Sequence, residues 1–378
     1  MQEFTSDQLM LRDMARRVAD EKISPLAAEI DAKSHYPDEL VDLFRKLDLF
    51  AIPYPEKYGG AGQGVLSACI MAEELAKVCS NSAMVPTTQE LGATPILLGG
   101  NEDQKSKYLP PICKGEVRVS FALTEPEAGS DVGNIQTKAV RKGNEYIING
   151  VKRFISYSDV ADIMVVFAKT DPAADARGLS ALIVDAHSPG ITIGKHEDKM
   201  GFRGFNACEV YFDEVHVPAE NLLAGEGQGF KLAMKTLDKT RPIVGAIGVG
   251  LAEGCLEYAI NYSKQRVQFG KPISSFQGLQ FMMADMAILV EASRQMVYKA
   301  ARAADNEDPE MAKLGAIAKC LATDTAMRVS VDAVQILGGS GYMREYPLER
   351  RMREAKLLQI VEGTNQIQRV VIANKILS

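Results

Sequence analysis

The amino-acid sequence predicts an α+β protein in which two helical regions flank a β-rich region. Apolar residues recur at helical spacing near both ends of the chain, whereas short alternating runs fill its middle. The 378 residues are enough for two or three structural units around large cores. We therefore expect helices up to about residue 115, strands from about 116 to 222, and helices again from about 226.

The first region carries an amphipathic helix pattern followed by a predicted loop. Its apolar residues at near-helical spacing are Leu9, Leu11, Met14, Ala15 and Val18. Arg16 and Arg17 fall on the opposite face of that helix. Prolines at positions 53 and 55, followed by two glycines at 59 and 60, predict a loop, after which residues 67–78 return to a helical pattern.

The middle region consists of short apolar runs, several with the period of two that is typical of half-buried β-strands. These runs cover residues 117–123, 163–167, 182–184, 208–212 and 215–217, the last of which ends at Pro218. The dipeptides at 149–150 (Asn-Gly) and 189–190 (Pro-Gly) are typical of turns. This spacing predicts a compact β-domain.

In the last region an apolar stripe recurs at steps of three and four residues along one predicted helix. Its members are Phe276, Leu279, Met283, Met286 and Val290. Residues 311–336 and 364–377 show a similar pattern. Such stripes are typical of core positions in a helix bundle, so we assign them to packing and not to a ligand.

Composition and charge argue against several classes of function. The net charge of −6 disfavours a nucleic-acid-binding protein. The chain shows neither a long apolar run nor a secretory signal, so no membrane span or secretion is expected. The cysteines form no Cys-x-x-Cys pair and are expected as buried, reduced thiols. The histidines are scattered along the chain, so no metal site is predicted.

Two strings of residues point to a carboxylate that works with an organic cofactor. In FALTEPEAGSD, at 121–131, an apolar start runs into a turn rich in hydroxyl groups and small residues. In VEGTNQ, at 361–366, Glu362 precedes Gly363, where a ligand can approach the backbone closely. With RVQFG at 266–270 and QILGG at 335–339, these strings resemble the acyl-CoA dehydrogenase family of flavoenzymes over essentially the whole chain.

The resemblance implies an N-terminal α-helical domain at 1–115, a middle β-domain at 116–225 and a C-terminal four-helix bundle at 226–378. It also implies FAD, with its flavin between the β-domain and the bundle. The backbone of Phe121 and Leu123 and the hydroxyl of Thr124 would hydrogen-bond the pyrimidine edge of the flavin, where they stabilise charge on the reduced ring. Phe154 would cover the ring, and the Ser156 hydroxyl would lie beside the nitrogen that accepts hydride. Many members carry Trp-Ile-Thr here, so Phe154 stacks with less area.

A second group of cofactor residues is implied to come from a neighbouring subunit, within a homotetramer that is a dimer of dimers. These residues, which would contact the diphosphate and adenosine half of FAD, are Arg266, Phe269, Gln277, Gln335, Gly338 and Gly339. Arginine offers a charged fork to phosphate, and glycines let a helix end approach the dinucleotide. Thr364 and Gln366 match further positions that touch FAD, and Ser130 is assigned to both the cofactor and the CoA.

Glu362 matches the catalytic base of the family. The base removes the α-proton of an acyl-CoA thioester while the β-hydrogen leaves as hydride to the flavin. Burial is expected to raise the pKa of this carboxyl toward the working pH, and Gly363 beside it gives the substrate room. Some branches carry the base at the position of Thr240, whose side chain has no carboxyl group.

The segment LDKTRP at 237–242 resembles short- and medium-chain members. There Asp238 and Arg241 are implied to contact the pantetheine and phosphate portion of CoA. The alternative for Arg241 is a salt bridge within the bundle. Val361 stands where many members have tyrosine, and its smaller side chain predicts tolerance for branched or cyclic acyl groups, such as cyclohexanecarboxyl-CoA.

The implied function is α,β-dehydrogenation of a short- or medium-chain acyl-CoA to the trans-2-enoyl-CoA, as in fatty acid β-oxidation. Electrons would pass to an electron-transferring flavoprotein. The alternatives are a relative of the oxidase or lyase type and, less favoured because Glu362 and Ser156 are intact, a non-catalytic acyl-CoA-binding protein. The expected location is the bacterial cytoplasm, or the mitochondrial matrix for a processed eukaryotic protein.

Overall fold

Helices make up the N-terminal part of the computed structural model, which describes residues 4–377. They are α1 (Ser6–Val18), α2 (Ala27–Lys33), α3 (Asp38–Lys46), α4 (Gly64–Ala76), α5 (Ser80–Gly99) and α6 (Glu102–Cys113). A capping box starts α1, because Thr5 accepts from the Gln8 N–H and the Gln8 side chain accepts from the Thr5 N–H. The predicted helix at 67–78 is confirmed as α4, which is buried along nearly its whole length.

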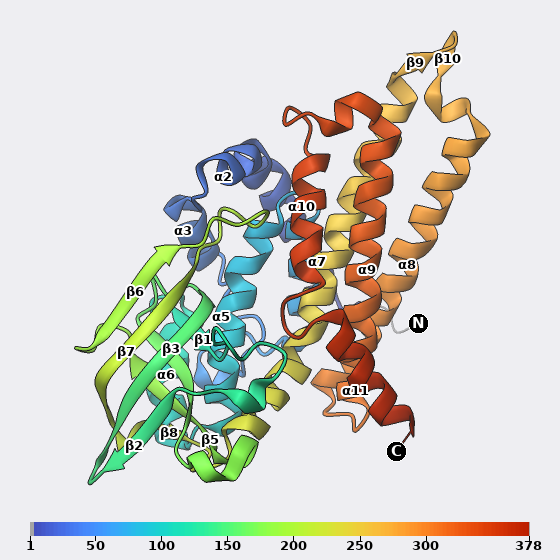
Figure 1. Cartoon of the computed structure of the whole chain (residues 1–378). Coiled ribbons are helices and arrows are strands. Elements are labelled where there is room, and N and C mark those ends of the chain that lie inside the picture. Colours follow the sequence, from blue (N-terminus) through green and yellow to red (C-terminus); the bar gives the residue numbers. More distant parts are fainter. Residues whose placement is uncertain (1–3, 378) are drawn as a thin grey trace.

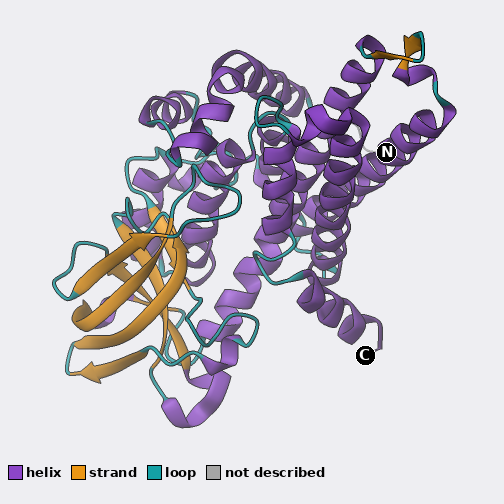
Figure 2. Ribbon diagram, turned by 45° about the horizontal axis from the view of Figure 1, so that its top comes forward, coloured by secondary structure: helices purple, strands orange, loops and turns teal. Residues whose placement is uncertain are grey.

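A single sheet follows, drawn in orange in Figure 2. Its strands are β1 (Val119–Ala122), β2 (Lys138–Lys142), β3 (Glu145–Ser156), β4 (Ile163–Lys169), β5 (Leu179–Asp185), β6 (Ile191–His196), β7 (Ala207–Pro218) and β8 (Leu222–Leu223). They are ordered β6-β7-β3-β2-β4-β5-β8, and β1 pairs with β4 in parallel. β4 is an unbroken apolar run because both of its faces are buried. Val165 and Phe167 belong to the core shared with α5 and α6, and Met164 and Val166 to a second core on the opposite face.

The structure corrects one detail of the β-domain. The runs at 208–212 and 215–217 are parts of one strand, β7, and not two. Glu214 has a left-handed backbone (φ +51°) within this strand, where the pairing with β3 shifts register. Asn149 of β3 stabilises the irregularity, because its side chain accepts from the Glu214 N–H (2.9 Å) and donates to the Glu214 carboxylate (2.7 Å).

Four long helices then form the predicted C-terminal bundle (Figure 1). They are α7 (Gly229–Gln265), α8 (Gln277–Asp305), α9 (Met311–Leu337) and α10 (Leu348–Leu358), and α11 (Asn365–Leu377) follows them. Figure 1 shows the small hairpin of β9 (Val267–Gln268) and β10 (Lys271–Pro272) at the end of the bundle far from α11. The stripe assigned to packing does pack, since Met286 and Val290 are buried and Leu279 and Met283 lie against the same core.

α7 is the central helix of the molecule and packs against α4, α5, α8, α9 and α10. It is the only helix in the described part of the chain long and apolar enough to cross a membrane, but 78% of its most apolar window is buried inside the protein. It is therefore a core helix. All six cysteines lie within the described residues and are buried free thiols, as predicted.

Candidate active site

Glu362 lies in the short loop between α10 and α11. The backbone there is left-handed at two successive residues, with φ +51° at Glu362 and +85° at Gly363. Glycine adopts this conformation freely, whereas glutamate does so only when its surroundings enforce it. The Gln368 side chain donates to the carbonyls of Glu362 (3.2 Å) and Gly363 (2.9 Å), and the Lys319 ammonium donates to the Gly363 carbonyl (2.9 Å). Anchors from α11 and α9 therefore hold the loop.

The carboxylate of Glu362 has one bonded oxygen and one free oxygen. Thr240 of α7 donates its hydroxyl to Oε2 (2.9 Å), while Oε1 has no hydrogen-bond partner among residues 4–377. Burial raises the pKa of Glu362 to about 7, and the Thr240 hydrogen bond, Arg241 and Lys319 act in the opposite direction. A carboxyl group with this pKa suits proton transfer near neutral pH. Thr240, the alternative position of the base that the resemblance implied, thus lies directly against Glu362.

A second buried carboxyl group, Glu90 of α5, was not predicted. Its side chain is 4% exposed, and its Oε1 has no hydrogen-bond partner within the described chain. Burial raises the pKa of Glu90 to about 8; Lys239 opposes this shift, and the charges of Glu362 and Asp305 add to it. Nothing in the sequence distinguishes Glu90 from a surface glutamate on a helix, so only the structure reveals it.

The two predicted flavin-binding segments lie side by side. The Arg153 N–H donates to the Thr124 carbonyl (2.8 Å), and the Ser120 hydroxyl donates to the Ser156 carbonyl (2.9 Å), so the end of β1 is tied to the end of β3. The side-chain hydroxyls of Thr124 and Ser156 have no partner in the described chain. Both are partly exposed and therefore available to a ligand.

Phe154 presents an exposed aromatic ring on which a ligand can stack. It is 55% exposed and has a left-handed backbone (φ +57°) at an irregularity in the pairing of β3 with β7. The Arg153 guanidinium lies 4.7 Å from the centre of its ring. An exposed aromatic ring in a strained conformation is costly, and a flat cofactor ring stacked on it would offset that cost.

A buried ion pair between Lys152 and Glu125 supports the predicted flavin-binding turn at residues 121–131. The fully buried Lys152 ammonium donates to the Leu123 carbonyl (3.0 Å) and to Glu125 (2.8 Å). Glu125 also accepts from the N–H groups of Gln136 (2.6 Å) and Thr137 (3.0 Å). Burial lowers the pKa of Lys152 to about 8, against the attraction of Glu125. Because both Leu123 and Thr124 are predicted flavin contacts, this pair fixes the backbone that the cofactor would touch.

The predicted CoA residues Asp238 and Arg241 bind each other. They form an ion pair one turn apart on α7, and Arg241 is only 3% exposed. The alternative of a salt bridge within the bundle is therefore what the structure shows for Arg241, and the contact of either residue with CoA stays a prediction. Ser130 is exposed near the end of the 121–131 segment. A Cβ at the neighbouring Gly129 would meet no atom within 4 Å, so this end of the segment is open.

The six cofactor residues assigned to a neighbouring subunit form a separate group. Arg266, Phe269, Gln277, Gln335, Gly338 and Gly339 are all exposed. They lie around the β9–β10 hairpin and the end of α9, where the Tyr262 hydroxyl donates to the Ser340 hydroxyl (3.2 Å) and links the two segments. Lys319 touches the Glu362 loop, and Gln335 lies about 24 Å further along the same helix, at about 1.5 Å per residue. The structure does not bring this group to Glu362 within one chain.

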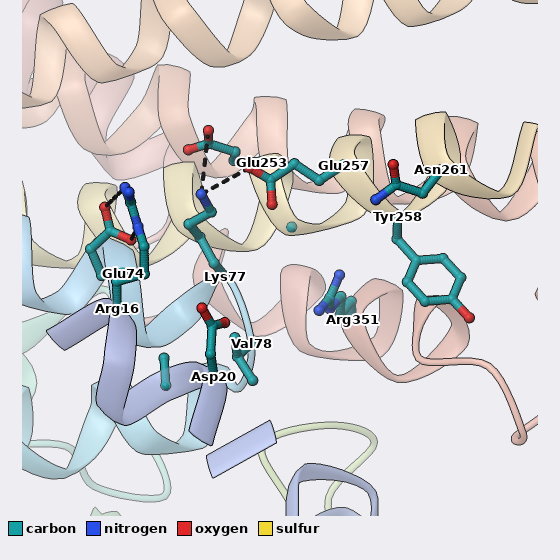
Figure 3. Close-up of a pocket in the computed structure, with 12 residues that line it drawn as sticks. Arg16, Asp20, Glu74, Lys77, Val78, Glu253, Glu257, Tyr258, Asn261 and Arg351 are labelled. Atoms are coloured by element: carbon teal, nitrogen blue, oxygen red, sulfur yellow. Dashed lines mark hydrogen bonds and ion pairs between the residues drawn. The ribbon is translucent and has the colours of Figure 1, made fainter. Parts of the chain in front are cut away.

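The structure has two notable cavities, of which only the smaller is lined by predicted site residues. A cavity of about 260 Å³ is lined by Thr364 and Gln366, two predicted FAD contacts, together with charged residues of α9 to α11. A larger cavity of about 470 Å³ lies among α1, α4, α7 and α10 (Figure 3). All the predicted site residues are described, and none lines the larger cavity. Its walls carry ion pairs such as Lys77 with Glu257 (2.9 Å), which do not suit an apolar acyl chain.

The structure also brings together three residues of the kind that bind metals. His196 Nε2 lies 3.0 Å from Asp159 Oδ2, and Cys208 lies beside them. Burial raises the pKa of the Cys208 thiol, and Lys199 is close enough to interact with Cys208 and Asp159. A cation therefore already belongs to this cluster, and we keep the prediction that the reaction uses no metal.

A helical domain, a middle sheet and a helix bundle, with a buried carboxylate and free hydroxyls on the sheet, match the arrangement that the resemblance implied for a flavin-dependent dehydrogenase. Three acyl-CoA dehydrogenase domains match the chain: the N-terminal domain at residues 5–116, the middle domain at 120–215 and the C-terminal domain at 227–377. The chain belongs to the acyl-CoA dehydrogenase family. It is an FAD-dependent oxidoreductase that acts on acyl-CoA.

Similar proteins cover the whole chain. A cyclohex-1-ene-1-carbonyl-CoA dehydrogenase of Geobacter metallireducens is 46% identical over 378 residues, 100% of both chains. Butyryl-CoA dehydrogenase from Megasphaera elsdenii has a TM-score of 0.98 and 43% identity, with 100% of both chains covered. A chain of the structure described as "Electron transferring flavoprotein of Acidaminococcus fermentans: Towards a mechanism of flavin-based electron bifurcation" has a TM-score of 0.97 and 47% identity over 100% of both chains.

Replacing Lys152 with methionine is expected to weaken FAD binding. The change removes the donor to the Leu123 carbonyl and leaves Glu125 as a buried charge without its cation, which typically costs about 3–5 kcal/mol. FAD affinity, measured by flavin fluorescence during reconstitution, should fall while the far-ultraviolet circular dichroism of the folded fraction is kept. The matched control is Lys142→Met, on the exposed end of β2. Unchanged FAD affinity in Lys152→Met would show that the pair does not support the cofactor site.

Proposed function

We propose that Glu362 is the catalytic base for α,β-dehydrogenation of an acyl-CoA. The observation that carries the proposal is the free Oε1 of a partly buried carboxyl group whose pKa is about 7. That oxygen takes the α-proton, the C–H electron pair becomes the new C=C bond, and the β-hydrogen leaves with its own electron pair. Bound FAD supplies the acceptor for that hydrogen and its electrons.

The chain's own residues divide the remaining work. Thr240 orients the carboxylate through Oε2, so that only the other oxygen faces a substrate. Leu123, Thr124 and Ser156 are proposed to hydrogen-bond the flavin, with Phe154 stacked over it; the free hydroxyls and the exposed ring support these roles. The loop of Glu362 and Gly363 offers backbone groups that polarise the thioester carbonyl as negative charge develops on its oxygen.

Glu362→Gln is expected to reduce the rate of flavin bleaching by acyl-CoA by about 10²–10⁴-fold, the usual contribution of general-base catalysis. The amide cannot accept the proton, yet it keeps the size of the side chain. In the parent enzyme the rate should fall as pH drops below about 7, because the pKa of Glu362 is raised and the base form is lost on acidification. Anaerobic stopped-flow absorbance measures both effects.

Exposed Glu39 on α3 provides the matched control, Glu39→Gln, which should bleach at the parent rate. Turnover at the parent rate in Glu362→Gln, with normal flavin content, would overturn the assignment of the base.

For the substrate, we propose a short or medium acyl group, with tolerance for a six-membered ring. Val361 is partly buried beside the catalytic loop and presents a small side chain there. The relatives support both parts of the proposal, since one is a butyryl-CoA dehydrogenase and another a cyclohex-1-ene-1-carbonyl-CoA dehydrogenase. Glu90 adds a second buried carboxyl group that interacts with Glu362, and we propose that its polarity helps to discriminate between acyl groups.

A panel of butyryl-, octanoyl-, isobutyryl- and cyclohexanecarboxyl-CoA tests this choice by anaerobic bleaching of the flavin. We expect turnover of cyclohexanecarboxyl- or isobutyryl-CoA as well as of a straight chain, and a selective loss of the ring substrate in Val361→Tyr, which fills the space. Turnover of straight chains alone in the parent would reject the tolerance for bulky acyl groups.

The electron acceptor is proposed to be an electron-transferring flavoprotein. One similar chain occurs in a structure of such a flavoprotein, and this similarity supports the proposal. A relative of the oxidase type would differ in its second half-reaction, because oxygen would reoxidise the reduced flavin rapidly without the partner.

We infer that the assembly is a homotetramer in which FAD is shared between two chains. Glu362 lies far from the six cofactor residues around the β9–β10 hairpin within one chain, so an FAD that touches both sets would take the hairpin residues from a second chain. Large apolar side chains on the hairpin, on α8 and α9 and in the turn after α9 are also exposed, as an interface requires: Val267, Phe269, Phe281, Ile288, Val331 and Tyr342. Phe269 alone is 93% exposed.

Phe269→Ser should therefore reduce both the sedimentation coefficient and the FAD retained after gel filtration. Val140→Ser, at an apolar side chain 53% exposed on β2, is the control and should change neither. A monomeric parent protein that retains full FAD would contradict the shared site.

A further inference from the structure

Lys319 is a buried cation that the proposed reaction does not yet use. It lies on α9 with 0% exposure, and its ammonium donates to the Gly363 carbonyl (2.9 Å) and to Asn365 Oδ1 (2.8 Å). Both acceptors are neutral, and no carboxylate of the described residues forms an ion pair with it. Burying an ammonium group without a counter-charge is costly, which points to a role for this charge.

Lys319 and Glu362 influence each other electrostatically. Burial lowers the pKa of Lys319 to about 8, and the strongest attraction that favours its charged form comes from Glu362, with smaller ones from Cys320 and Asp324 and a repulsion from Arg241. The influence is mutual, since Lys319 is among the groups that lower the pKa of Glu362. Near neutral pH the two side chains therefore favour each other's ionised form.

The other groups around Glu362 do not replace this charge. From α7, Thr240 contributes a neutral hydroxyl, and the charge of Arg241 is paired with Asp238. From α5, Glu90 is a carboxyl group that is destabilised as an anion beside Glu362. Gln368 of α11 bonds only the backbone of the loop. Of the two cations that lower the pKa of Glu362, Arg241 is paired with Asp238, whereas Lys319 forms no ion pair with a carboxylate of the described residues.

We propose that Lys319 is a positioning residue for proton abstraction: its ammonium holds the left-handed backbone at Gly363, and its unpaired charge stabilises the ionised form of Glu362. The proposal rests on the function proposed for Glu362. It assigns two separable tasks to one side chain, a hydrogen bond to the loop and an electrostatic effect on the base.

Two substitutions separate these tasks. Lys319→Gln keeps an N–H donor for the Gly363 carbonyl but removes the charge, whereas Lys319→Met removes both. In each variant the pKa of Glu362 should rise further, so the acid limb of the flavin-bleaching rate should move to higher pH by about one unit. The rate on the alkaline plateau should stay near the parent value in Lys319→Gln and fall in Lys319→Met, where the loop loses an anchor.

Lys313→Met is the matched control, because Lys313 lies on the same helix and pairs with Glu310 near the surface. It should leave the acid limb in place. Rates are normalised to bound FAD, and thermal unfolding is followed in parallel, so that a loss of stability is not read as an effect on the base. If Lys319→Met does not fold, the position of the acid limb in Lys319→Gln alone tests the electrostatic role of Lys319.

An acid limb in Lys319→Gln that coincides with the parent limb would overturn the electrostatic role. Glu362→Gln is measured in the same series, so that the two proposals fail separately. If Glu362→Gln keeps the parent rate and acid limb, the proposed function fails. If it abolishes the rate but Lys319→Gln leaves the limb unchanged, only the role of Lys319 fails.

Discussion

The site depends on one constraint: the carboxyl group of Glu362 must be enclosed by protein and still be able to ionise. Burial alone would keep it protonated, because a charge loses the solvation of water. The hydroxyl of Thr240 and the cations Arg241 and Lys319 oppose this effect, and the result is a pKa of about 7. A stronger set of cations would make the carboxylate a weaker base, and a weaker set would leave it protonated.

The same groups also determine where the carboxylate lies. A left-handed backbone at Glu362 would be lost in a mobile loop, but the loop here joins two helices and is bonded from α9 and α11. The φ angle of +85° at Gly363 favours glycine, and a Cβ there would lie 2.7 Å from the Gln368 amide nitrogen, so it would displace a side chain that anchors the loop. Because long packed helices carry the anchors, the base is held on rigid elements.

Much of this arrangement could be predicted from the sequence, because its signals are local. The stripe at Met286 and Val290 and the apolar run of β4 follow from periodicity, and the strings around Thr124 and Glu362 carried the family resemblance. β7 was divided in two because Asp213 and Glu214 interrupt the apolar pattern, and no sequence rule shows that a side chain from another strand supports that bulge.

Buried charges were the main omission. Lys152 and Lys319 are fully buried and Glu90 is nearly so. In the sequence a buried lysine or glutamate looks the same as one on the surface. Lys152 did carry a signal, since it continues the inward positions of β3 after Tyr146 and Ile148, and a charge at such a position implies a partner. The partners themselves, Glu125 for Lys152 and Gly363 for Lys319, come from other elements, and only tertiary structure identifies them.

The pairing of Asp238 with Arg241 bears on how CoA is held. Arg241 gives only Nη1 to Asp238, and its Nε has no hydrogen-bond partner within the described residues, so a donor is left for a ligand while the pair stays intact. Complete departure of Arg241 from Asp238 would break a largely buried pair, which typically costs about 3–5 kcal/mol. Its departure would also remove one of the charges that lower the pKa of Glu362. Inside the bundle Arg241 therefore helps to keep the base ionisable, and its contact with CoA, like that of the exposed Ser130, stays a prediction.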